Sequence, residues 1–221
     1  MAEPDSSTPA ATTPEWEQWR RDMFGDPYLV MHDGPDFTAL LPAARSNAQS
    51  VTRMLAAGIS AGDSVAAESV TALTSAGLAP VQLQAPLATA IATASGTLRV
   101  RLAQALYALT ADPAWADPIA SVLATGPHWV HRMDAAIALA TFAPTPTLIH
   151  ALSQAVCDAD YLVRYHAANT LLRYAGLPGT IVDHRKLFKK LRMPVAGRPA
   201  SAADRSAWRD AADQLSAAAL H

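Results

Sequence analysis

The sequence predicts an all-α fold, an α-solenoid of about four similar helix pairs with a capping helix at each end. Three observations support this prediction: abundant alanine, apolar residues at helical spacing between short Gly/Pro/Asp turns, and a motif that recurs about every 33 residues. Alanine is the strongest helix former. No stretch alternates apolar and polar residues as a half-buried strand would.

The composition of the 221-residue chain is typical of a folded protein. Hydrophobic residues make up 51% and charged residues 16%, whereas disordered chains are poor in apolar residues. The one cysteine, Cys157, allows neither an internal disulfide nor a cysteine-based zinc site, and we interpret it as a small buried apolar residue. We find no secretory signal and no apolar run of membrane-spanning length, so we expect a cytoplasmic protein with no membrane partner.

Capping signals divide the chain into four regions. Residues 1–12 should form a flexible tail, 13–35 an N-terminal capping helix and loop, 36–178 the repeated helix pairs, and 179–221 a basic helix and a C-terminal capping helix. In the second region, Thr13 and Pro14 fit an N-cap and a first helical position, and Trp16 and Trp19 would cover the first pair. In the last region, Asp183 could cap the basic helix, which carries Phe188 on its inner side. Ser201 and Asp204 have capping-box spacing before an apolar stripe that begins at Trp208.

The middle region contains eight predicted helices that end at Gly, Pro or Asp. They span about residues 39–57, 61–76, 81–94, 97–110, 114–125, 129–142, 147–157 and 160–175. The second helix of a pair repeats an arginine, at Arg99, Arg132 and Arg164, in steps of 33 and 32 residues. Aligned in this way, Leu106, Leu139 and Leu171 coincide, and Leu73 lies one step earlier in a segment without the arginine. Because one pair cannot bury its apolar stripe alone, the pairs should stack.

One segment carries a family resemblance. Asp158-Ala159-Asp160-Tyr161-Leu162-Val163-Arg164, followed by Ala167, Ala168 and Leu171, resembles HEAT repeats in the short bacterial form found in phycobilin-lyase-type proteins. The likeness is strongest in 160–174 and extends in weaker form over about 36–176. It implies a right-handed superhelix whose second helices line a concave face. It also implies that the repeated arginine bonds acids or carbonyls at the turns between repeats, although Arg99 and Arg132 lack an upstream acid.

No catalytic motif is found. The sequence contains no G-x-S-x-G, P-loop, G-x-G-x-x-G or H-E-x-x-H. His128 and His131, with Asp134 one turn on, have a spacing that metal ligands can use. We interpret the two histidines as capping or solvated side chains, and we expect no metal, no cofactor and no enzymatic activity.

The face opposite the buried stripe predicts a partner-binding surface. Its residues in the last three repeats are Arg101, Gln104, Met133, Asp134, Ile137, Tyr165, His166, Asn169 and Arg173, preceded by Glu68 and Thr71 in the first. Tyr, Met and Arg are enriched at protein interfaces, and exposed apolar neighbours such as Met133 and Ile137 tend to mark contacts. Arg101, which is not one of the repeated arginines, is the one arginine in the repeats that we expect to point freely into this face. An ordinary solvent-facing surface is the alternative.

A second charged feature lies near the C-terminus, where residues 161–221 hold ten basic and four acidic residues. Its basic pole consists of Arg185, Lys186, Lys189, Lys190 and Arg192. It is either the solvated face of a capping helix or a docking site.

We therefore expect a non-catalytic protein–protein interaction module, such as an adaptor or a toxin-neutralising immunity protein, with a partner protein on the concave face. The alternative is an enzyme on a HEAT-like scaffold that acts on nucleic-acid bases or a tetrapyrrole. Nucleic acid is not the expected partner, because residues 41–160 hold five arginines against seven acids and supply no basic stripe.

Overall fold

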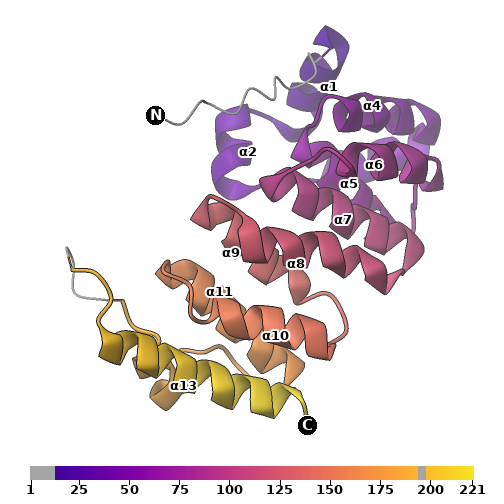
Figure 1. Cartoon of the computed structure of the whole chain (residues 1–221). Helices are drawn as coiled ribbons and strands as arrows, with labels where there is room; N and C mark the ends of the chain where they lie inside the picture. The colour runs from indigo at the N-terminus through magenta and orange to yellow at the C-terminus, as the bar shows by residue number, and fades with distance from the viewer. Residues whose placement is uncertain (1–12, 194–197) are drawn as a thin grey trace. The chain divides into compact units, whose positions relative to one another are not determined.

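The computed structural model describes residues 13–193 and 198–221, and all regular structure in these ranges is helical. The helices are drawn along the chain in Figure 1. The all-α prediction is therefore confirmed, while the tail predicted for residues 1–12 lies outside the described ranges. None of the described helices combines the length and apolar character that a bilayer crossing requires.

The helices group into two compact units. Unit 1 runs to Ala94 and includes Arg101–Asp112, and unit 2 contains Ser95–Val100 and Pro113–His221. The division falls within α7 (Gly96–Thr110), whose first turn belongs to unit 2 and whose remainder belongs to unit 1.

Unit 1 begins with a helix that the sequence predicts correctly. Its elements are α1 (Pro14–Phe24), α2 (Pro27–Asp33), α3 (Leu40–Ser46), α4 (Ala48–Ser60), α5 (Ser64–Ser75), η1 (Val81–Leu83) and α6 (Gln84–Ile91). Thr13 caps α1 by accepting a hydrogen bond from the Trp16 backbone N–H at 3.3 Å. The sequence analysis missed α2, because it used Gly25 and Pro27 only as the end of α1, whereas Asp26 and Pro27 also start a new helix.

The predicted helix over 39–57 is divided in two. Asn47 adopts a non-helical conformation, and its side chain accepts a hydrogen bond from the Ser50 backbone N–H at 3.1 Å. Asparagine in this position is a strong N-cap. The chain therefore ends α3 and begins α4 at a single residue, and α4 then packs against α5 and α6.

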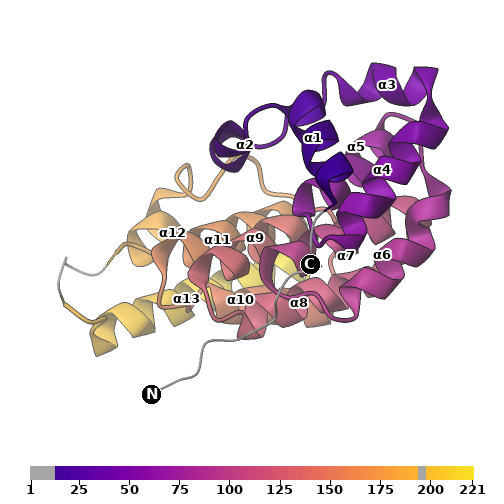
Figure 2. The ribbon, with the colours of Figure 1, turned by 90° about the horizontal axis from the view of Figure 1, so that it is seen from above.

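Trp16 joins α1 to α4, and the two helices are shown in Figure 2. Its side chain is fully buried, and its Nε1–H donates to Asp63 at 3.1 Å. Gly58 on α4 leaves room for the indole, since a Cβ there would lie 2.5 Å from a ring atom. Asp63 also pairs with Arg20 at 2.7 Å and caps α5 through the Val65 N–H. One carboxylate therefore fixes both the first helix and the start of α5.

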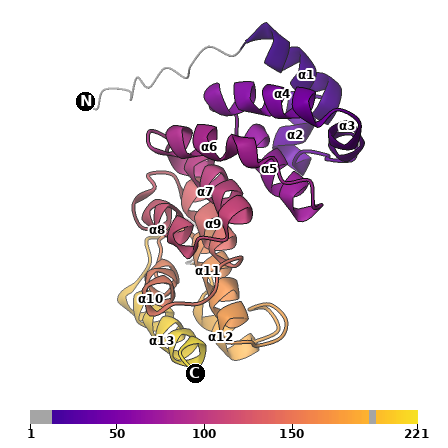
Figure 3. The same cartoon turned by 90° about the vertical axis from the view of Figure 1, so that its right-hand side faces the viewer.

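Unit 2 arranges its helices in two rows. Its further elements are η2 (Pro113–Trp115), α8 (Ala116–Thr125), α9 (Trp129–Leu139), α10 (Pro146–Ala155), α11 (Tyr161–Tyr174), α12 (Arg185–Lys190) and α13 (Ala202–Ala219). One row consists of α8, α10 and α13, and the other contains α9, α11 and α12 (Figure 3). Consecutive helices within a row contact each other, except that α12 contacts α13 in the opposite row.

The last helix has the predicted capping box. The Ser201 hydroxyl accepts from the Asp204 N–H, and the Asp204 carboxylate accepts from the Ser201 N–H. Trp208 and Leu215 are buried where α13 packs on α10 and α11. The prediction for Asp183 is wrong: it accepts from the Thr180 N–H at 2.8 Å instead of capping α12. The turn before the helix uses this carboxylate, which accepts from the N–H and hydroxyl of a residue three positions upstream.

The predicted burial of the four core leucines is confirmed. Leu73, Leu106, Leu139 and Leu171 are all at most 1% exposed, and they lie on α5, α7, α9 and α11. All four leucines are therefore interior residues of their units.

Candidate functional site

The repeat arginines Arg132 and Arg164 make equivalent bonds. Arg132 Nη1 donates to the Gly126 carbonyl at 2.8 Å, and Arg164 Nη1 donates to the Asp158 carbonyl at 2.7 Å. Each acceptor lies six residues upstream of its arginine. Arg132 adds two bonds to the Asp158 carboxylate, of 2.7 and 3.0 Å, and this hydrogen-bonded pair raises the pKa of Arg132. The acid that Arg132 lacks upstream is thus supplied from downstream, and both arginines are structural.

In unit 1, the predicted surface residue Arg101 is paired. Its Nε donates to Glu68 at 2.8 Å, and its Nη1 donates to the Gln104 side-chain oxygen at 3.0 Å. Glu68 lies 33 residues earlier, which is one repeat step, so the two side chains come from equivalent helix positions. The expectation of a free arginine is therefore wrong, because Glu68 on α5 provides its counter-ion.

In unit 2, the predicted surface begins with half-buried side chains. Asp134 on α9 accepts a 2.6 Å hydrogen bond from the Thr97 hydroxyl. Tyr165 on α11 stacks edge-on against the next residue, His166, with ring centres 5.1 Å apart. Met133, the residue before Asp134, is half-buried. Asp134 and Tyr165 are thus engaged in contacts within the unit.

Four predicted residues converge on a single cavity of about 520 Å³, which we call the unit 2 hollow. Its lining is Ile137, Ala140, His166, Asn169, Thr170, Arg173, Gly176, Leu177 and Gly179. The side chains at 166, 169, 170 and 173 come from one face of α11, because residues three and four apart are helix neighbours. Ile137 and Ala140 come from the end of α9, and the loop after α11 supplies the rest.

Hydrogen bonds fix the walls of the unit 2 hollow. Thr170 donates to the Ala136 carbonyl and Tyr174 donates to the Leu139 carbonyl, both at 2.7 Å, and these bonds hold α11 against α9. The Asn169 side-chain oxygen accepts from the Ile181 N–H at 2.7 Å, which holds the following loop. The shape of the cavity is therefore set by hydrogen bonds between α9, α11 and the following loop.

The lining combines hydrogen-bond donors with exposed apolar surface. Ile137 is 42% and Leu177 is 39% exposed. Burial lowers the pKa of His166, against a smaller opposing effect of Asp134, so its imidazole is mainly neutral at pH 7. Arg173 is exposed and charged. No aspartate or glutamate is among the residues that line this cavity.

The basic pole lies on α12 and its C-terminal end. Lys190 forms an ion pair with Asp210 of α13, and Arg192 Nε donates to the Lys189 carbonyl at 3.2 Å. Arg185, Lys186 and Lys189 are exposed. One of the five cations is thus neutralised by the fold, and the two interpretations of this pole stay open.

The histidine pair has structural contacts. His128 Nδ1 accepts from the Val130 N–H at 3.3 Å, which confirms it as a cap of α9. The His131 ring lies against Gly96, where a Cβ would come within 2.7 Å of the ring, and Asp134 bonds Thr97. Within residues 13–193 and 198–221, no three His, Cys, Asp or Glu side chains form a group that could hold a metal.

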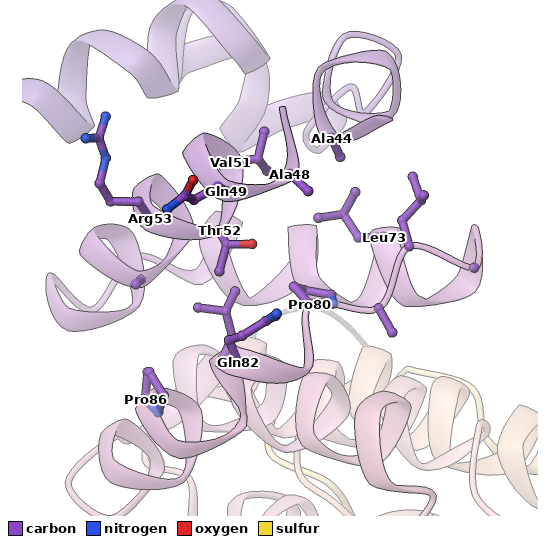
Figure 4. Close-up of a pocket in the computed structure, with 15 residues that line it drawn as sticks. Ala44, Ala48, Gln49, Val51, Thr52, Arg53, Leu73, Pro80, Gln82 and Pro86 are labelled. Carbon is purple, nitrogen blue, oxygen red and sulfur yellow. The ribbon is translucent and has the colours of Figure 1, made fainter. Parts of the chain in front are cut away.

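A larger cavity of about 910 Å³, which was not predicted from the sequence, lies in unit 1, and we call it the unit 1 groove (Figure 4). It is lined by Ala44, Ala48, Gln49, Val51, Thr52, Arg53, Ala56, Leu73, Gly77, Leu78, Ala79, Pro80, Gln82, Leu83 and Pro86. The break at Asn47 and the loop before η1 shape it, and the prediction of one continuous helix over 39–57 concealed it. Its polar side chains are two amides, Gln49 and Gln82, the hydroxyl of Thr52, and Arg53, which pairs with Glu15 at 3.4 Å.

Comparison of the chain with protein-family models, with curated proteins and with solved structures found no match.

Proposed function

We propose that this protein is a non-catalytic protein-binding module that holds part of a partner protein in the unit 2 hollow. One observation carries the proposal. Ile137, His166, Asn169 and Arg173, expected from the sequence to face a partner, line one preformed cavity together with the exposed Leu177. Interfaces combine such apolar anchors with a few polar groups that orient the partner.

Helix stacking of the HEAT type is part of this proposal. Its support is the two rows of helices in unit 2, the matching carbonyl bonds of Arg132 and Arg164, and the common burial of four leucines. The hollow lies on α9 and α11, the second helices of their pairs. In α-solenoids, binding surfaces form where successive repeats present equivalent faces. A role as a cytoplasmic adaptor or immunity protein fits this arrangement.

The chemistry of the hollow favours binding over catalysis. Nucleophilic catalysis needs a side-chain nucleophile within hydrogen-bond reach of a general base. The one hydroxyl in the lining, that of Thr170, donates to a backbone carbonyl. The side-chain oxygen of Asn169 accepts a hydrogen bond from the Ile181 N–H. The lining therefore offers recognition groups and no activated nucleophile.

Site-specific photo-crosslinking tests the proposal. A photoreactive amino acid replaces Ile137 in the full chain, expressed in the cells that naturally produce it, and crosslinked species are identified by mass spectrometry. Gln154, exposed on α10 outside the hollow, is the matched control, and Gln82 reports on the unit 1 groove. We expect one discrete protein adduct at position 137 and none at 154.

Other results would contradict the assignment. The same adduct at position 82 but not at 137 would move the binding site to the unit 1 groove. Crosslinked nucleic acid at position 137 would favour the enzyme alternative. An absence of any specific adduct at 137 would overturn the proposal for the hollow.

A further inference from the structure

We propose that the unit 2 hollow recognises the carboxylate of an aspartate or glutamate side chain on the partner protein, together with an adjacent apolar side chain. This inference rests on the proposed function and names the chemistry of the partner. It follows from which groups line the cavity, which groups only adjoin it, and how its apolar surface is placed.

The polar groups that face the cavity have donors to offer. Arg173 carries a guanidinium with five N–H groups, which can hold a carboxylate through two parallel bonds. The side-chain oxygen of Asn169 accepts a hydrogen bond from the Ile181 N–H, so its amide N–H₂ group is the part that can donate to a ligand. The neutral imidazole of His166 carries one N–H donor. These three side chains lie within two turns of α11, on one face.

Two carboxylates adjoin the cavity without lining it. Asp134 accepts from the Thr97 hydroxyl at 2.6 Å. Asp183 accepts from the Thr180 N–H and hydroxyl, and these bonds lower its pKa. A Cβ on Gly179 would come within 2.6 Å of Asp183, so this carboxylate lies close to a residue that lines the hollow. Since these charges offset part of the positive potential, selectivity must come from the directed bonds of the donors.

The apolar part of the hollow accounts for the second half of the motif. Ile137 from α9 and Leu177 from the loop after α11 are both exposed, and Ala140 lies one turn beyond Ile137. A carboxylate group alone would leave the apolar surface of Ile137 and Leu177 in contact with water. A neighbouring apolar side chain of the partner would cover it, and burial of apolar area is the main favourable term in association. The occupant is thus an acidic residue beside an apolar one.

Arg173 also has a possible structural role, which the test must separate from recognition. It lies in the last turn of α11, where a cation interacts favourably with the helix dipole. Arg45 lies in the last turn of α3 and is likewise exposed. Arg45→Gln is therefore a control that removes a comparable charge from a comparable helix position outside the hollow.

The test begins with selection of binders from a displayed library of random 12-residue peptides, on the full-chain protein. Selected peptides are made with amidated C-termini, which removes the terminal carboxylate, and their Kd is measured by fluorescence anisotropy. We expect enrichment of Asp or Glu next to an apolar residue. Replacing that acid by its amide, or Arg173 by Gln, should raise Kd about tenfold, the effect of losing a charge-assisted bond. Arg173→Lys should raise Kd less, and Arg45→Gln should leave it unchanged.

Several results would overturn the inference. These are selection of peptides without an acid, equal Kd values for the Arg173→Gln and Arg45→Gln variants, or binding that depends on a free C-terminus. The outcomes also separate the two proposals. If position 137 crosslinks a partner whose affinity is insensitive to Arg173→Gln, the binding function stands and carboxylate recognition fails. If neither experiment finds a ligand at the hollow, both fail.

Discussion

The guanidinium carbon of Arg164 lies 3.9 Å from the centre of the Trp208 ring, so a cation from α11 rests on an aromatic side chain of α13. Arg164 is 0% exposed, and its nitrogens donate to carbonyls of Asp158 and Ala159 in one segment and Leu191 and Arg192 in another. Burial lowers the pKa of Arg164. Backbone dipoles and the indole face hold this charge, and they join α13 to the repeat core.

Replacing Arg164 by Met should destabilise unit 2 strongly. The methionine fills much of the volume but leaves buried carbonyl oxygens without donors, and each such loss costs about 1–3 kcal/mol. We expect a loss of about 3 kcal/mol in the free energy of unfolding, measured by urea denaturation. Arg173→Gln, an exposed change, should stay within about 0.5 kcal/mol of the natural protein. Equal stability of both variants would show that Arg164 does not join these segments.

The Arg132–Asp158 pair should show coupling in a double-mutant cycle. Both side chains are less than one-fifth exposed, and the carboxylate accepts two bonds from the guanidinium. We expect Arg132→Met and Asp158→Asn together to cost about 1 kcal/mol less than the sum of the single changes. Additive effects would mean that the two residues act independently. The free energies of unfolding for the cycle are calculated from the urea midpoints with one common m-value.

Gly58 should be required only because Trp16 covers it. A methyl group at position 58 would collide with the indole, so Gly58→Ala should cost about 2 kcal/mol, as overpacking does. In a Trp16→Ala background the same change should be neutral or stabilising, since alanine favours the helix. A penalty that persists without the indole would contradict this packing. Thermal unfolding of the four variants provides the comparison.

His166 should make stability fall in mild acid. Burial holds its folded pKa below the ordinary value of 6.5, so the unfolded chain binds the proton more readily. Stability from this group is fully present above about pH 6.5 and is lost as the pH falls through that value towards the folded pKa. His166→Gln should flatten the decline in unfolding free energy between pH 7.5 and 5. His150→Gln on the exposed face of α10 is the control, and identical slopes for the two variants would refute the effect.

Local signals predicted much of the fold. Thr13 and Ser201 start helices where expected, and the 33-residue step placed Leu73, Leu106, Leu139 and Leu171 in the interior. These features depend on residues close in sequence or on strict periodicity. The second start signal at Pro27 was present but was interpreted only as an end.

Contacts between repeats were harder to predict. Glu68 pairs with Arg101, and Asp158 pairs with Arg132, across intervals of 33 and 26 residues. Such pairs depend on how helices are placed side by side, which propensity and capping do not specify. The same limit applies to the hollow: the sequence indicated the surface that includes Ile137 and Arg173, but the loop residue Leu177 completes the cavity.

Hydrogen–deuterium exchange is the measurement that shows whether a partner protein binds at the unit 2 hollow. Amide exchange of the full chain is compared with and without the crosslink-identified partner. The proposal predicts slower exchange on binding at the end of α9, residues 137–140, and in the loop lining the hollow, residues 176–181. Protection confined to residues 77–86 of the unit 1 groove, or to the basic pole at 185–192, would contradict it.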